Sequence, residues 1–86
     1  MLHTKLLEDS ILACLGPFPE GLISSEMNMM TAKHLKLSPE TLDLRTPDGT
    51  KNLFAYRMAW ARTHLKNRGL IAMNSNRRWV LVKGDH

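Results

Sequence analysis

The sequence predicts a mostly helical α+β domain with three main helices, a short helical turn and a C-terminal β-hairpin. Apolar side chains recur at helical spacing in residues 3–15 and 54–65, whereas residues 70–82 contain two short apolar runs around a turn rich in Asn and Ser. The 86 residues, 43% of them hydrophobic, suffice for one small core and not for two. We therefore expect residues 1–86 to form a single domain, with its core in about residues 3–82 and a short flexible C-terminus.

The N-terminal half is expected to hold two helices. The spacing of leucine and isoleucine predicts a first helix from about His3 to Leu15. The GPFPEG segment at 16–21 must be a turn, because two prolines and two glycines cannot continue a helix. A very short extended piece at 22–23 follows, and Ser24 is a credible N-cap for a second helix through about residue 35.

A further helix start follows at residues 38–40. In Ser38-Pro39-Glu40 the serine can cap, the proline suits the first helical position and an acid follows, which predicts a short helical turn through Leu42. RTPDGTKN at 45–52 is then a loop, with Pro-Asp-Gly as its turn. The long helix is expected from Lys51 or Asn52 to Arg68, and Gly69 can end it in the left-handed conformation.

A hairpin completes the chain, with strands at 70–73 and 78–82 around the turn at 74–76. Helices followed by one hairpin, in fewer than ninety residues and with basic charge on the last helix and the hairpin, are typical of a winged helix-turn-helix domain. This is the fold class that we predict.

The charge is divided between the two halves of the chain. Residues 1–44 carry three cations and six acids, whereas residues 45–86 carry nine cations and two acids. Between Gly49 and Gly84 there is no acid at all. A basic segment of this kind is commonly the footprint of a polyanionic partner.

The long helix has two predicted sides. At about 100° per residue, Phe54, Met58, Ala61 and Leu65 share one arc, with Trp60 beside them, and we expect this arc to face the core. The opposite side is polar, basic and lined with small residues, which would let the helix approach a DNA groove closely. The predicted DNA-binding residues of this helix and its start are Lys51, Asn52, Tyr56, Arg57, Ala59, Arg62, Thr63 and Lys66.

Several of these residues have a second interpretation. Arg62 and Lys66 could form a merely solvated face, although the absence of interleaved acids favours nucleic acid. Arg57 lies at the border of the two sides, and both a structural ion pair and a phosphate contact remain open. The turn of the hairpin is either a plain polar turn or a wing tip, in which case Asn76, Arg77 and Arg78 would lie beside a minor groove or backbone phosphates.

Several segments of the chain together resemble those of a known family. PDGT, then FAYRMAWARTHLKNRGLI, then a hairpin ending in RRWVLV resembles the N-terminal domain of the Mrr restriction-endonuclease family, a winged helix-turn-helix module. The likeness is concentrated in residues 47–82, at Phe54, Arg57, Trp60-Ala61-Arg62, Leu65, Gly69-Leu70-Ile71 and Trp79. One difference is the hairpin, where Asn76-Arg77 stands in place of the Arg-Gly usual in the family.

The resemblance implies a module that binds DNA for a separate nuclease domain. Carried over to this chain, it implies that residues 52–68 form the recognition helix and residues 74–78 the wing tip. The implied partners are double-stranded DNA and a nuclease domain or subunit, and a homodimer would suit a target of two half-sites.

Catalytic chemistry is not expected. A nuclease needs clustered carboxylates to hold a metal ion, and the acids here are scattered over the N-terminal half. Four separated histidines and one cysteine do not make a zinc site, and no phosphate-binding glycine motif is present. We therefore expect no enzymatic activity, no cofactor and no metal. The single cysteine and the absence of an apolar run of about 20 residues predict a cytoplasmic protein without membrane attachment.

Two hypotheses for function follow. The first is a winged helix that binds double-stranded DNA, in a restriction-type or mobile-element system or as a small stand-alone protein. The alternative is a protein-interaction or dimerisation module without DNA binding, in which the methionines of SEMNMMTAKHLK form an adaptable apolar surface.

Overall fold

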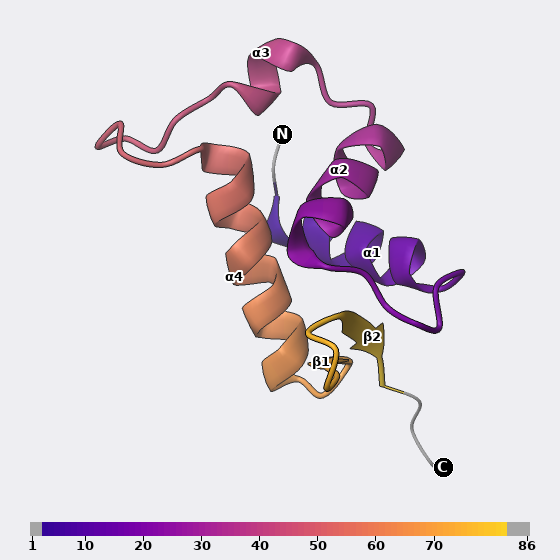
Figure 1. Cartoon of the computed structure of the whole chain (residues 1–86). Helices are drawn as coiled ribbons and strands as arrows, with labels where there is room; N and C mark the ends of the chain where they lie inside the picture. Colours follow the sequence, from indigo (N-terminus) through magenta and orange to yellow (C-terminus); the bar gives the residue numbers. More distant parts are fainter. Residues whose placement is uncertain (1–2, 83–86) are drawn as a thin grey trace.

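The structure, a computed structural model, describes residues 3–82 (Figure 1). Its elements are α1 (Thr4–Leu15), α2 (Ser24–His34), α3 (Pro39–Leu42), α4 (Leu53–Asn67), β1 (Ile71–Met73) and β2 (Trp79–Leu81). The predicted fold class is confirmed, because this order of helices and a final antiparallel hairpin is α+β and consistent with a winged helix. The predicted flexible C-terminus lies outside the described residues.

The helix boundaries agree with the sequence except at the start of α2. Ser24 is the first helical residue and not the cap, a position that Ile23 holds in an extended conformation. The Ile23 N–H donates to Glu26 Oε1 at 3.1 Å, which satisfies the first exposed donor of the helix. The shift accompanies contacts with Trp79: Leu22 pairs with it in an isolated bridge, and the Ser24 hydroxyl accepts a hydrogen bond from the Trp79 indole at 3.1 Å.

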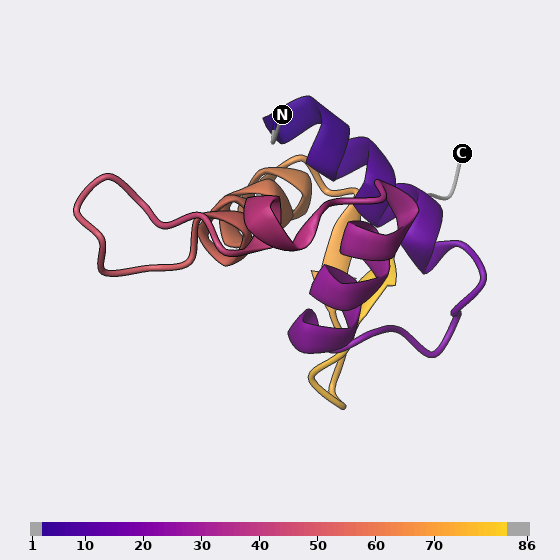
Figure 2. The same ribbon diagram turned by 90° about the horizontal axis from the view of Figure 1, so that it is seen from above.

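The connection from α3 to α4 is an ordered loop that extends away from the helices (Figure 2). Asp48 organises it: Oδ1 of this residue accepts hydrogen bonds from the Thr46 hydroxyl at 2.6 Å and from the N–H and hydroxyl of Thr50 at 3.1 and 2.9 Å. These bonds to the charged form lower the pKa of Asp48 to about 2, with the Thr46 bond the largest cause. An isolated bridge between Arg45 and Asn52 closes the base of the loop.

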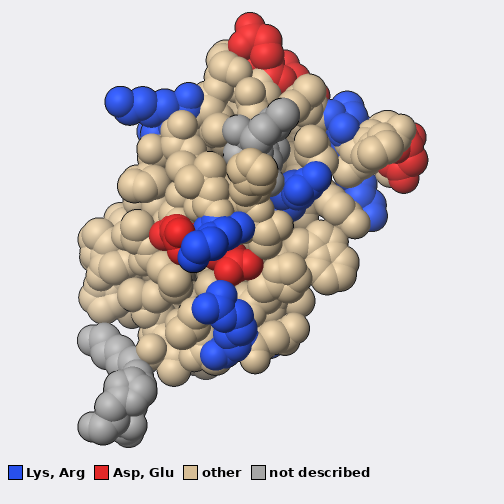
Figure 3. Space-filling model, turned by 180° about the vertical axis from the view of Figure 1, so that it is seen from behind, with Lys and Arg blue, Asp and Glu red and all other residues tan. Residues whose placement is uncertain are grey.

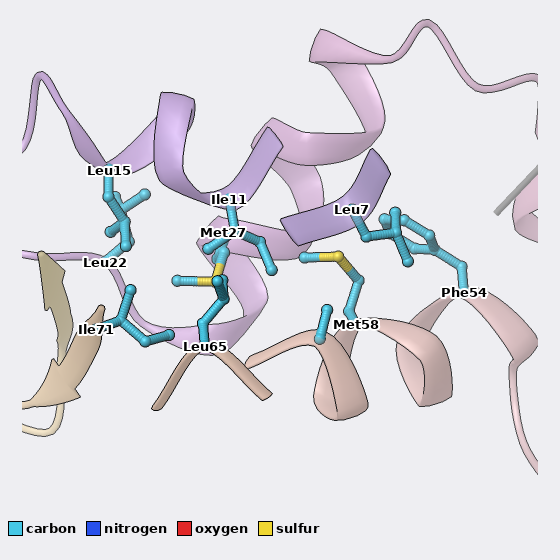
Figure 4. Close-up of a cluster of buried hydrophobic side chains, with 10 residues drawn as sticks. Leu7, Ile11, Leu15, Leu22, Met27, Phe54, Met58, Leu65 and Ile71 are labelled. Carbon is cyan, nitrogen blue, oxygen red and sulfur yellow. The ribbon is translucent and has the colours of Figure 1, made fainter. Parts of the chain in front are cut away.

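One hydrophobic core joins α1, α2, α4 and the hairpin (Figure 4). Leu7, Ile11 and Leu15 of α1 meet the buried side of α4, and Met27 of α2 and Ile71 of β1 close the cluster. The predicted core residues of the long helix, Phe54, Met58, Ala61 and Leu65, are all buried. Cys14 is also buried, and this burial raises the pKa of its thiol.

The hairpin is fastened to the N-terminal half at Gly21 and Leu22. Leu22 and Trp79 exchange both backbone hydrogen bonds, at 3.0 and 2.8 Å. Gly21 has φ 90°, and a Cβ there would lie 2.6 Å from the Trp79 carbonyl oxygen. Only glycine fits this approach, so the turn before α2 sets the position of the wing.

Candidate nucleic-acid interface

The long helix α4 divides into a buried side, an edge facing α1 and an outer face. We use the name outer face for its exposed residues Ala55, Tyr56, Ala59, Trp60, Thr63 and Lys66. Of the eight predicted DNA-binding residues of this helix and its start, four lie on the outer face, namely Tyr56, Ala59, Thr63 and Lys66. Two others, Arg62 and Asn52, are engaged within the domain.

Arg62 was predicted to face outward, and that prediction is wrong. Its side chain is buried between α4 and α2, with 8% of the residue exposed. One guanidinium nitrogen donates to Asn28 Oδ1 at 2.7 Å and lies 4.0 Å from the Met27 sulfur. Arg62 is about 80° from Phe54 on the helix, within the stripe that a packed helix buries. The contacts with Met27 and Asn28 of α2 hold the side chain of Arg62 inside the domain.

Asn52 was also predicted to bind DNA from the outward side of the helix, but the structure uses its side chain within the domain. It is the N-cap of α4: its side-chain oxygen accepts the Ala55 N–H at 3.0 Å, and its side-chain nitrogen donates to the Leu42 carbonyl at 2.6 Å. Both halves of the amide are therefore engaged within the domain. The sequence signal that was missed is the position of Asn52 directly before the helical run, where Asn is a preferred cap.

Trp60 was predicted to anchor α4 to the core, and the structure places it outside with 49% exposed. It packs instead along the helix, with its ring centroid 6.5 Å from that of Tyr56 and 5.9 Å from that of His64. The error has the same origin as that for Arg62, because the buried stripe is centred toward Arg62 and away from Trp60. A row of aromatic rings one turn apart consequently lies on the surface.

The edge of α4 that faces α1 mixes the signs of charge. The Glu8 carboxylate of α1 accepts from Arg68 at 3.0 Å and lies 3.4 Å from His64 Nδ1, and Lys5 pairs with Asp9 at 3.7 Å. Figure 3, the view from behind, shows Lys and Arg side chains beside Asp and Glu side chains on this face. Internal neutralisation makes it a poor surface for a polyanion.

At the N-terminal end of α4, Lys51 and Arg57 are exposed. The Lys51 ammonium lies 5.3 Å from the centroid of the Tyr56 ring, within the range of a cation–π contact. Both cations line a pocket of about 330 Å³ together with Tyr56 and the loop residues Thr46 to Asp48. By helical angle Arg57 lies about 60° from Phe54, at the border of the core-facing side, as the sequence predicts.

In the middle of α4 the outer face is made of small residues. Ala59 and Thr63 are both exposed, and the Thr63 hydroxyl donates back to the Ala59 carbonyl at 3.0 Å. Together with Tyr56 and Trp60 they line a second pocket of about 230 Å³. Lys66 is exposed one turn further along the helix.

The hairpin turn presents one of its two arginines. Asn74 Oδ1 accepts the N–H groups of Asn76 and Arg78 at 2.9 and 3.0 Å, which fixes the shape of the turn. Asn76 and Arg77 are exposed. The prediction that Arg78 lies at the tip facing outward is not met, because its guanidinium turns inward to the Gly21 carbonyl at 3.4 Å and to Glu26 at 3.5 Å.

Arg77 holds an unusual backbone conformation, with φ 59°. A left-handed conformation costs a non-glycine residue about 1 kcal/mol or more. Glycine would hold this conformation with less strain.

Comparison with known proteins gives one match. The family model described as the Mrr N-terminal domain matches residues 7–83. The chain belongs to the Mrr N-terminal domain family. Neither the comparison with curated proteins nor that with solved structures gives a match.

The Mrr N-terminal domain match relates the chain to restriction systems and corresponds to the N-terminal domain rather than the nuclease domain. In the described part of this Mrr N-terminal domain, no helix is long and apolar enough to cross a membrane. Across residues 3–82, no group of three or more His, Cys, Asp or Glu side chains is placed to hold a metal ion.

Proposed function

We propose that this Mrr N-terminal domain binds double-stranded DNA, with α4 as the recognition helix and residues 74–78 as the wing. The observation that carries the proposal is the outer face of α4. It is built from small and aromatic side chains, its flanking charges at Lys51 and Lys66 are positive, and α4 contains no acid. Such a face can enter a groove while cations at its ends meet phosphates.

The wing supports the same proposal through Arg77. A glycine would hold φ 59° with less strain, yet a cation occupies the position and is exposed. Strained residues cluster at functional sites, because the surrounding structure must offset their cost. Arg77 is therefore proposed to contact the DNA backbone, while Arg78 holds the wing against α2.

The roles of the other predicted residues change accordingly. Lys51, Tyr56, Arg57, Lys66 and Asn76 are proposed to contact phosphate or sugar, and Ala59 and Thr63 to lie against the groove. Arg62, Asn52 and Arg78 are proposed to support the interface from within the domain. A nuclease domain or subunit, or a second copy of the chain, is the partner that such a reading module would serve in the cytoplasm, without enzymatic activity of its own.

Titration of a labelled duplex by fluorescence anisotropy tests the proposal. Four cationic contacts with phosphates, from Lys51, Arg57, Lys66 and Arg77, predict that the logarithm of the affinity falls with the logarithm of the salt concentration with a slope of about −4. Lys66→Ala should weaken binding and reduce the magnitude of this slope by about one. Lys5→Ala removes the same charge from an exposed position on α1, where Lys5 pairs with Asp9, and should leave both quantities unchanged. If duplex binding is absent, or Lys5→Ala weakens it as much as Lys66→Ala, the proposal fails.

The alternative, a protein-interaction module, has one specific observation in its favour. Met29 is 55% exposed and lines a mostly apolar groove of about 450 Å³ between α2 and the start of α4, with Lys33 and Lys36 beside it. Met27, by contrast, belongs to the core. Protection of Met29 in a dimer, measured by oxidation together with light scattering, and no shift of duplex DNA would favour this function.

A further inference from the structure

The two sequence-predicted residues best suited to read bases by paired hydrogen bonds are occupied elsewhere. Arg62 is buried against Asn28, and Asn52 caps α4. Thr63 directs its hydroxyl hydrogen to its own helix at 3.0 Å. Between residues 55 and 66, the outer face therefore holds no Arg, Asn or Gln side chain that could make a paired hydrogen bond to a base edge, and Asn67 lies beyond it in the last turn.

What the outer face offers instead is an apolar pocket. Ala59 and Thr63 are small side chains one turn apart, and the Tyr56 and Trp60 rings border the space of about 230 Å³ beside them. The two rings pack edge to face, at an interplanar angle of 76°. This mutual contact holds them on the surface as walls of the pocket.

The charges around the pocket indicate the kind of molecule to which the bound apolar group is attached. Lys51 lies over the Tyr56 ring at one end and Lys66 is exposed at the other, and α4 has no acid to balance them. An apolar pocket with a lysine at each end fits an apolar group that is carried on a polyanion. In the major groove of DNA, the apolar group on the base edges is the C5-methyl group of thymine.

We propose that the pocket formed by Tyr56, Ala59, Trp60 and Thr63 reads the methyl group of thymine by van der Waals contact. The proposal rests on the proposed function, because it requires α4 to enter the major groove. It assigns sequence preference to apolar contacts on the outer face, whereas the overall affinity comes from the cations Lys51, Arg57, Lys66 and Arg77. The preferred sites should accordingly carry A·T pairs where the middle of α4 meets the groove.

Replacing thymine by uracil isolates this contact, since uracil lacks only the methyl group and keeps every hydrogen-bonding group. The experiment compares the affinity of the chain for a duplex of alternating adenine and thymine with that for the same duplex containing uracil. The thymine duplex should bind more tightly by about fourfold for each methyl group in contact, the value expected for burying one methyl-sized group.

Two variants separate methyl reading from other effects. Trp60→Ala removes a wall of the pocket from an exposed position and should bring the thymine-to-uracil affinity ratio close to one. Lys66→Ala should weaken binding to both duplexes equally and keep the ratio. A difference between the duplexes that arises from DNA shape would persist in Trp60→Ala. Far-ultraviolet circular dichroism checks that both variants fold.

The outcomes are distinct. Equal affinity for the two duplexes overturns the inference and leaves the proposed DNA binding standing. A preference for thymine that Trp60→Ala does not reduce overturns it as well. Binding to neither duplex overturns both the inference and the proposed function, while a ratio that falls only in Trp60→Ala supports both.

Discussion

Arg62 of α4 donates a 2.7 Å hydrogen bond to the side-chain oxygen of Asn28 in α2, and both residues lie where the two helices meet. The acceptor is neutral, and none of the described carboxylates forms an ion pair with this guanidinium. Burial lowers the pKa of Arg62 without discharging a group whose ordinary value is so high. The pair therefore joins α2 to the helix that carries the outer face, by a charge-assisted bond in a largely dry setting.

The first prediction concerns this pair. Arg62→Ala should lower the free energy of unfolding by roughly 2–3 kcal/mol, because it removes both packing and a hydrogen bond to a charged group. Asn28→Ala should cost about 1–3 kcal/mol, because a buried charge loses its acceptor. Arg62→Met keeps an apolar side chain of similar length and should recover most of the loss. Urea unfolding measures all three, and an Arg62→Ala variant as stable as the parent would contradict the buried position.

The second prediction concerns Asn52. Asn52→Ala should destabilise the domain by about 1–2 kcal/mol, since it removes the helix cap and the bond to the Leu42 carbonyl. Asn52→Asp keeps the capping oxygen and should cost less. Thermal unfolding gives the stabilities, and binding to a set of duplexes gives the sequence preference. A change of preference without loss of stability would restore Asn52 to the role of base reader.

Arg77 and Arg78 provide a matched pair at the wing. Arg77→Gly should leave the domain at least as stable as the parent, because glycine holds φ 59° without strain, and should reduce the salt dependence of duplex binding by about one phosphate contact. Arg78→Ala removes the same charge from a side chain that bonds the Gly21 carbonyl and Glu26. It should lower stability and leave the salt slope unchanged. If Arg78→Ala reduced the salt slope and Arg77→Gly left the slope unchanged, the proposed wing contact would be refuted.

The pH dependence of the projecting loop follows from Asp48. Its pKa is about 2 in the folded chain against an ordinary value of 3.8. Because folding lowers the pKa of Asp48, the ionised carboxylate stabilises the loop fully at pH values above about 4. This stabilisation is lost as the pH falls from about 4 through 2 and the carboxylate is protonated. The Thr50 amide, which donates to Asp48, should therefore keep its chemical shift down to about pH 3 and change below it. Asp48→Asn should abolish this transition, and a midpoint near 3.8 would contradict the hydrogen bonding described for the loop.

Local chemistry explains why so much of the fold was predictable. Gly69 follows the last turn of α4 and holds the left-handed conformation that ends the helix, with φ 77°. Ser38 caps α3, because its hydroxyl oxygen accepts the Thr41 N–H at 3.1 Å. Capping, turn formation and helical periodicity depend on neighbours within about four residues, so they can be derived from the chain itself. The start of α2 was missed for the opposite reason, since Leu22 and Ser24 bond to Trp79, which lies far along the chain.

The sequence by itself determined the order of elements, the buried row of Phe54, Met58, Ala61 and Leu65, the acid-free second half and membership of the Mrr N-terminal domain family. Only the tertiary structure decided that Arg62 turns inward and Trp60 outward. On the helical wheel Arg62 lies about 80° from Phe54 on one side and Trp60 about 120° on the other, and the residue types favour the opposite directions. The packing of α2 on one side of α4, at Met27 and Asn28, settles their directions, and that contact joins residues more than thirty positions apart.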